Sequence, residues 1–98
     1  MKLQRIVKMS FDPDKVENFL KMYNKVNHKI SGFPGCHGVK LLRDLHQDNV
    51  FFTYSTWDSE EDLNNYRNSE LFSGVWKETK SYFNDRPQAW SLEIVQFS

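Results

Sequence analysis

Residues 51–57 form a strongly apolar stretch whose side chains are aromatic, β-branched or Ser. This composition favours a β-strand. Alternation along the strand predicts one face with Phe51, Thr53, Ser55 and Trp57 and a second face with Val50, Phe52, Tyr54 and Thr56. Neither face is polar enough to lie in water, so we expect both sides of this strand to be covered.

Three further stretches, residues 3–11, 36–43 and 89–97, show enough alternation to predict strands. The alternation is clearest in the first and last of them. Arg5 interrupts the apolar face of the first stretch. The chain therefore carries four expected strands.

The polar residues 44–49 have the length of a hairpin connection between two of these strands. The second and third strands should therefore be antiparallel neighbours. A hairpin centred near the middle of this connection places three pairs on one face, namely Arg43 opposite Phe51, Val39 opposite Ser55 and His37 opposite Trp57.

Apolar residues at helical spacing follow the first strand and the third strand. Asp12 precedes a proline, which is typical of a capping acid before the first helical position, and Gly32 should end this helix. Ser59 is followed by acidic residues and predicts the start of a short second helix. Asn68-Ser69-Glu70 indicates a break and a fresh cap, which begins a second helical segment that we expect to reach Phe83.

The predicted order is β-α-β-β-α-β, the split arrangement of a ferredoxin-like α+β fold. The two helical regions of this order can cover only one face of the sheet. An apolar second face marks an interaction surface, and a symmetric homodimer supplies a second sheet to cover it. We therefore expect one domain over residues 1–98 that forms a dimeric α+β barrel.

Charge and composition exclude several other classes of protein. Lys and Arg together equal Asp and Glu in number, at 13 each, and no basic run occurs, so nucleic acid is not an expected partner. No stretch approaches the length of a membrane span, and we expect a cytoplasmic protein without a membrane partner. Cys36 is the single cysteine and the histidines lack metal-ligand spacing, so we expect no disulfide, metal or cofactor.

Side chains on the sheet face toward the helices, together with aromatic side chains of the helices, should form a pocket that suits a flat aromatic or hydrophobic ligand. Expected from the sheet are Leu41, Arg43, Phe51, Thr53 and Ser55, and from the helices Phe19, Tyr23, Phe72 and Trp76. The alternative interpretation is that these side chains fill the core and leave no space for a ligand.

His37, Trp57 and Tyr66 are the candidate catalytic residues. A histidine titrates near neutral pH and could remove a proton from a phenol or quinol beside Trp57. The alternative for His37 is a histidine at the surface end of a strand. His28 near a helix end and His46 in the hairpin connection are weaker candidates.

Several motifs together resemble the antibiotic biosynthesis monooxygenase (ABM) domain. They are the Phe33–Cys36 turn before residues 39–44, the run from Phe51 to Glu61, and the segment from Tyr66 to Phe72. The resemblance spans nearly the whole chain and implies a dimeric α+β barrel with a pocket between the sheet and the helices. Members of the family include cofactor-independent oxygenases of anthrones and quinols, haem-degrading enzymes and a processing enzyme for a quorum-sensing signal.

The residues that carry these activities are only partly present. Trp57 matches the pocket Trp of the anthrone-oxidising type, whereas Thr53 stands in place of its Asn and Leu41 and Leu63 in place of its Tyr residues. The haem-degrading type needs an Asn on the first strand, which is missing, and its Trp and His positions hold Tyr66 and Trp76. The imidazoles that flank the Ser-x-x-Phe segment in quinol-oxidase-like members are also missing.

These observations predict a cofactor-independent monooxygenase that acts on a small aromatic such as a quinol or polyketide-like phenol. The alternative is a non-catalytic homodimer that binds a small hydrophobic ligand or serves in stress or regulation. Haem degradation is a third possibility.

Overall fold

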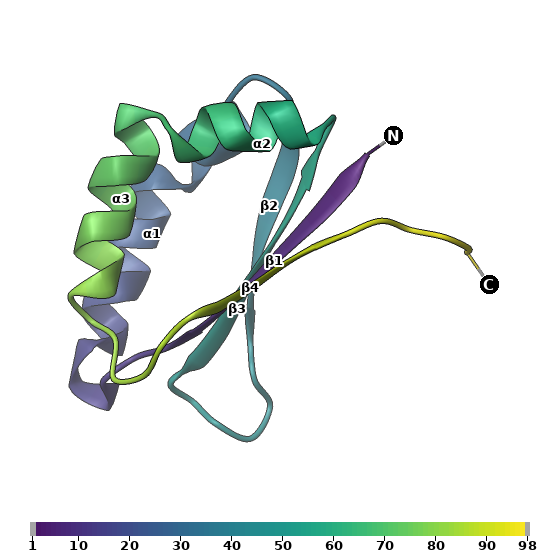
Figure 1. The fold of residues 1–98 in the computed structure, drawn as a ribbon. Coiled ribbons are helices and arrows are strands. Elements are labelled where there is room, and N and C mark those ends of the chain that lie inside the picture. The colour runs from purple at the N-terminus through teal and green to yellow at the C-terminus, as the bar shows by residue number, and fades with distance from the viewer. Residues whose placement is uncertain (1, 98) are drawn as a thin grey trace.

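The computed structural model describes residues 2–97 and consists of one antiparallel sheet with every α-helix on the same side of it (Figure 1). The strands are β1 (Leu3–Ser10), β2 (Cys36–Arg43), β3 (Val50–Trp57) and β4 (Gln88–Leu92), in the spatial order β2-β3-β1-β4. The helices are α1 (Val16–Ser31), α2 (Glu60–Arg67) and α3 (Glu70–Lys80), with a short 3₁₀ turn at Pro13–Lys15 before α1. The expected ferredoxin-like α+β fold is confirmed.

The helix starts follow from capping side chains in the sequence. The Asp14 amide donates to the Asp12 carboxylate at 3.0 Å and opens the 3₁₀ turn. The Ser59 hydroxyl accepts from the Asp62 amide at 3.1 Å, and the Ser69 hydroxyl begins α3 with a bond of the same length. Each hydroxyl satisfies an amide that has no partner within its helix. The expected second helical region is therefore two helices.

The face of the sheet toward the helices, here called the covered face, is arranged in cross-strand rows. The two outer rows carry large side chains, with Met9 beside Phe51 at one end and Leu3 beside Trp57 at the other. The two middle rows carry smaller or flexible side chains across the sheet, namely Leu41, Thr53, Val7 and Ala89 in one and Val39, Ser55, Arg5 and Ser91 in the other. Buried aromatic side chains therefore gather near the two ends of the sheet.

The opposite side of the sheet, here called the open face, has no helix over it (Figure 1). Ile6 pairs with Tyr54 on one side and with Trp90 on the other, and Phe52 pairs with Leu42. Trp90 and Leu42 are 41% and 45% exposed. A band of apolar side chains therefore remains uncovered in a single copy of the chain.

Three expectations from the sequence are wrong in detail. Trp57 pairs with Cys36 rather than His37, because a bulge between Cys36 and Val39 shifts the register, whereas the pairs at Arg43 and Val39 are as expected. The last strand ends at Leu92 rather than at residue 97, because its partner β1 begins at Leu3 and Gln4 already pairs with Leu92.

The third correction concerns the end of α3. This helix ends at Lys80, because the chain turns there to carry Phe83 into an isolated bridge with Phe11 before β4. None of the helices within residues 2–97 combines the length and the apolar character required to cross a membrane.

Candidate functional site

A cavity of about 310 Å³ lies between the covered face and the three helices. Binding pockets for small molecules have volumes of roughly 300–1,000 Å³, and a cavity of about 150 Å³ can already hold benzene. The cavity is therefore large enough for a ligand of one or two fused rings. Eight of the expected site residues line it, namely Phe19, Tyr23, Thr53, Ser55, Trp57, Tyr66, Phe72 and Trp76.

The cavity exists because the middle rows of the covered face carry small side chains. Val7, Val39 and Ala89 line the cavity from three strands beside Thr53 and Ser55. Larger side chains in the outer rows and in the helices hold the two layers apart around this space. A sheet with large residues in all four rows would fill the same volume.

An aromatic series forms one wall of the cavity. Trp57 stacks on Tyr66 with ring centroids 5.0 Å apart, and Phe72 meets Tyr66 edge to face at 5.2 Å. Trp76 continues the series by stacking on Phe72 at 5.8 Å. Such rings favour another flat ring as a neighbour.

Trp57 is fixed by a hydrogen bond inside the protein. Its indole Nε1 donates to the Ser55 hydroxyl at 2.9 Å, and the side chain is only 1% exposed. Because the indole N–H is paired and the ring is buried against Tyr66, Trp57 forms the closed end of the aromatic wall, and Ser55 positions it.

The Tyr23 hydroxyl is the one buried side-chain oxygen or nitrogen of the described residues that has no hydrogen-bond partner. Tyr23 lines the cavity from α1 and is 7% exposed. Burial, followed by the nearby Cys36 thiol, raises its pKa above the ordinary value. Burial also strongly raises the pKa of the Tyr66 phenol, so both groups stay neutral donors at physiological pH.

Two arginines, Arg5 from β1 and Arg67 at the end of α2, also line the cavity. Arg5 donates from Nη1 to the Ser91 hydroxyl at 2.9 Å. Burial, followed by the charge of Arg67, lowers the Arg5 pKa from its ordinary value, although a guanidinium stays charged. Within residues 2–97 no Asp, Glu or His lines the cavity.

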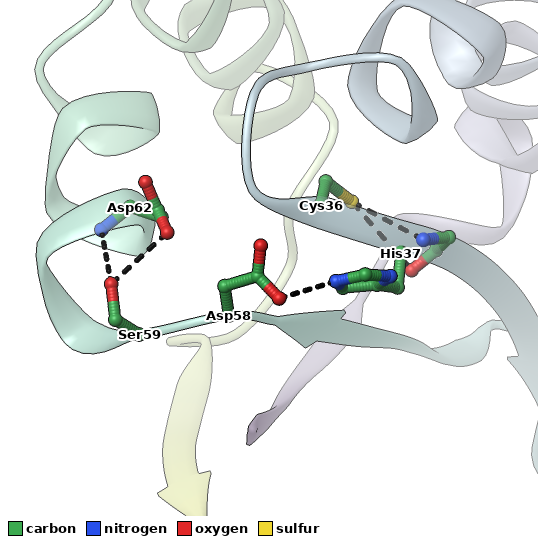
Figure 2. Close-up of polar contacts among 6 residues, drawn as sticks. Cys36, His37, Asp58, Ser59 and Asp62 are labelled. Carbon is green, nitrogen blue, oxygen red and sulfur yellow. Dashed lines mark hydrogen bonds and ion pairs between the residues drawn. The ribbon is translucent and has the colours of Figure 1, made fainter. Parts of the chain in front are cut away.

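His37 lies outside this lining. Figure 2 shows its ring directed at Asp58, with His37 Nε2 and Asp58 Oδ1 2.5 Å apart, and both side chains are about half exposed. The bulge at Gly38, which has a φ of +130°, turns this part of β2 away from the expected register. The role of His37 as a base stays a prediction, and the structure places its side chain outside the cavity lining.

The other three expected residues outside the lining lie near the connection that joins β2 to β3. The Arg43 guanidinium sits 4.7 Å from the centre of the Phe51 ring, in a cation–π contact at the surface. Phe51 is buried in the core, and Leu41 packs against the same cluster. These side chains support the end of the sheet rather than the cavity.

The sequence analysis did not assign Arg5 to the site. The available signal was a charged residue on an otherwise apolar strand face, which is costly to bury and therefore calls for an explanation. The helix-side residues Met22 and Ile30 were missed for a different reason, since apolar side chains at helical spacing do not reveal whether they meet a cavity.

The described residues contain no group of three or more His, Cys, Asp or Glu side chains that could hold a metal ion. The thiol of Cys36 faces the backbone of Gly38, whose amide donates to the sulfur at 3.5 Å (Figure 2). Burial raises the pKa of this thiol, which disfavours the reactive thiolate.

Solved structures share this fold closely. The crystal structure of an antibiotic biosynthesis monooxygenase superposes with a TM-score of 0.89 at 17% identity, covering 96% of this chain and 99% of the other. The same TM-score is found for Rv0793 from Mycobacterium tuberculosis, at 11% identity over 100% and 99% of the chains. A conserved protein from Methanosarcina mazei Go1 also gives 0.89, at 14% identity over 94% and 91%.

At these identities the structural likeness concerns the fold alone. Comparison with curated protein sequences gave no match. The family model of antibiotic biosynthesis monooxygenases, however, matches residues 4–77, which include β1 to β3, α1, α2 and most of α3. The chain therefore belongs to the antibiotic biosynthesis monooxygenase family.

Proposed function

We propose that the protein is a cofactor-independent monooxygenase that oxidises a small phenolic or quinol-like aromatic in the cavity between sheet and helices. The observation that carries this proposal is the cavity of about 310 Å³ with a wall of four aromatic rings. The family relationship supports the reaction class.

The reaction suits a phenol that can tautomerise to a ketone. In this keto form the substrate carries an activated CH₂ group, whose protons are acidic. Loss of one proton gives an enolate, which passes one electron to O₂, and the two radicals combine to form a C–O bond. The resulting peroxide anion takes up a proton to give a hydroperoxide, which loses water, so the CH₂ carbon becomes a carbonyl. One oxygen atom enters the product, and the other leaves in water with the two hydrogens of the CH₂ group.

The cavity would contribute orientation and exclusion of water. Phe72 and Trp76, the half-buried rings of the wall, offer stacking surfaces, and Tyr23 and Tyr66 offer neutral hydroxyl donors. The proton is taken either by His37, as the sequence predicts, or by solvent while the cavity stabilises the enolate. The absence of Asp, Glu and His from the lining formed by residues 2–97 favours the second route.

Oxygen uptake with a panel of hydroquinones and anthrones tests the proposal. The wild type should consume O₂ above the spontaneous rate, and Thr53→Phe should abolish this because the larger ring fills the middle of the cavity. Ser73→Phe adds the same ring on the exposed side of α3 and is the matched control. No uptake by folded wild-type protein with any member of the panel would contradict the proposal.

A second candidate function is binding without turnover. It is favoured by the lack of an acid or base of near-neutral pKa in the described lining and by the missing polar residues of the characterised types. Thermal stabilisation by an aromatic compound without oxygen uptake would support this candidate. Haem degradation has less support, because no histidine of residues 2–97 lines the cavity to ligate iron.

The active assembly in this proposal is a homodimer formed through the open face. Ile6, Tyr54 and Trp90 lie side by side there, and an exposed apolar face of this kind is typical of an interface. Residues 93–97 extend beyond the sheet and carry three further exposed apolar side chains, Ile94, Val95 and Phe97 (Figure 1). A second copy of the chain would cover both features by two-fold symmetry.

A further inference from the structure

The cavity has an unequal charge distribution. Its lining contains two arginines and, within residues 2–97, no Asp or Glu. The one ion pair found among the described residues, between His37 and Asp58, lies elsewhere. A half-buried positive charge beside apolar surface is costly unless an opposite charge compensates it. A bound anion would supply that compensation.

Arg5 is the better placed of the two arginines. It projects from the middle of the sheet, between Ser55 on β3 and Ser91 on β4, and its one side-chain hydrogen bond within residues 2–97 uses Nη1. A guanidinium has five N–H donors in a planar fork, so donors remain for a second partner. Arg67 is exposed at the end of α2, where a helix C-terminus already favours a cation.

The buried hydroxyl of Tyr23 supplies a second, independent indication of a ligand. It lines the same cavity from α1 and lacks a hydrogen-bond partner among the described residues. An unpaired buried hydroxyl is unfavourable, and an acceptor oxygen on a ligand would satisfy it.

We propose that the cavity binds an aromatic anion, a planar ring system carrying a carboxylate or a phenolate, with Arg5 binding the anionic oxygens and Tyr23 donating a further hydrogen bond. The aromatic wall receives the ring at Phe72 and Trp76, which line the cavity and are only half-buried. This inference names the ligand class for the proposed function and rests on the same cavity. It does not depend on oxygenation.

Isothermal titration calorimetry with 2-naphthoate and its neutral near-isostere 2-naphthamide tests the preference. Wild-type protein should bind the carboxylate about 10-fold or more tightly, since hydrogen bonds to charged groups are stronger than neutral ones. Equal affinity for the two probes, or no binding of either, would overturn the proposal.

Variants assign the preference to residues. Arg5→Gln should remove most of it, and Arg5→Lys should keep part of it because the charge remains without the planar fork. Lys8→Gln is the matched control, because it removes one positive charge from the opposite face of the same strand. Tyr23→Phe should weaken binding of both probes by about 3–10-fold. A preference that survives in folded Arg5→Gln protein would refute the role of Arg5.

A second probe pair separates the two sources of negative charge. 4-Nitrophenolate is compared with its methyl ether, 4-nitroanisole, at mildly alkaline pH. Preference for the phenolate assigns a phenol-derived ligand, and preference confined to naphthoate assigns a carboxylic acid. Oxygen uptake is measured separately, so anion preference without turnover refutes the monooxygenase proposal alone, and turnover without anion preference refutes this inference alone.

Discussion

The two faces of the sheet differ in how they are covered and in how completely they are packed. The covered face has three helices over it but leaves a cavity of about 310 Å³ unfilled, because its middle rows carry small side chains. The open face carries large apolar side chains in the middle, at Ile6, Tyr54 and Trp90, and no helix of residues 2–97 lies over them. The same strands therefore combine space for a small ligand on one side with surface for a large partner on the other.

Because of this contrast, alternate residues of the same strand should affect different properties, either ligand binding or assembly. On β3, Thr53 and Ser55 line the cavity, and Tyr54 between them points to the open face. Since neighbouring side chains in a strand point to opposite faces, substitutions at adjacent positions should separate ligand binding from assembly. The following experiments use that separation.

The largest expected effect is on assembly. Tyr54→Lys places a charge at the centre of the proposed interface in both copies and should raise the dimer dissociation constant by about 100-fold or more. Size-exclusion chromatography with light scattering measures it. Ser73→Lys on the exposed side of α3 should leave the dimer intact. A wild-type protein that is monomeric at micromolar concentration would refute the dimer.

A large effect on stability is expected at Gly35, in the turn just before β2. Gly35 has a φ of +85°, and a Cβ there would lie 2.4 Å from Asp62 Cγ. Gly35→Ala should therefore lower the free energy of unfolding by about 2–4 kcal/mol, from left-handed strain and the clash together. Urea denaturation measures this value.

Two other glycines provide matched controls for this experiment. Gly38 has a φ of +130° but open space around it, so Gly38→Ala should cost only the backbone strain, about 1–2 kcal/mol. Gly74 lies within α3 with open space around it, and Gly74→Ala should raise the free energy of unfolding by about 0.5–1 kcal/mol. Equal losses at Gly35 and Gly38 would exclude a contribution from Asp62.

A smaller effect of unusual sign is expected inside the cavity. Tyr23→Phe removes a buried hydroxyl that has no partner among residues 2–97, so the ligand-free protein should gain about 1 kcal/mol of stability. Thermal unfolding with and without 2-naphthoate measures the change. A loss of stability in the ligand-free protein would show that the hydroxyl is already hydrogen bonded in solution.

The smallest effect should occur at the edge of the sheet. His37→Ala removes an exposed pair with Asp58 and should change the free energy of unfolding by less than about 1 kcal/mol. Oxygen uptake by the same variant tests the predicted role as a base. A loss much larger than that of Asp58→Asn would support a direct role for the imidazole.

Local signals in the sequence were sufficient for most of the fold. β2 has its expected bounds, and β3 begins one residue before the expected stretch, at Val50. Ser59 begins α2 as expected, and the cap of α3 is Ser69, within the expected break at residues 68–70. These features depend on alternation and on caps within a few residues. The bulge before Val39 and the end of β4 depend on pairing with distant strands, which periodicity along one stretch does not reveal.

The candidate site was predictable in its aromatic wall and in the small residues Thr53 and Ser55, but not in its charged part. Trp57, Tyr66 and Phe72 were expected to face inward from their spacing, and they form the wall. The contribution of Arg5 depends on which side chains lie across from it in the folded sheet. Strand register brings it beside Ser55 and Ser91, and those neighbours lie about 50 and 86 residues away in the chain.

The three tryptophans of the chain are distributed over the parts of the molecule that these experiments separate. Trp57 is enclosed at one end of the cavity, Trp76 lines its helical wall, and Trp90 lies on the open face. Single-tryptophan variants would therefore emit separately from each place. A shift confined to Trp90 would report self-association, and quenching of Trp57 and Trp76 would report an occupied cavity, in one fluorescence titration without an attached dye.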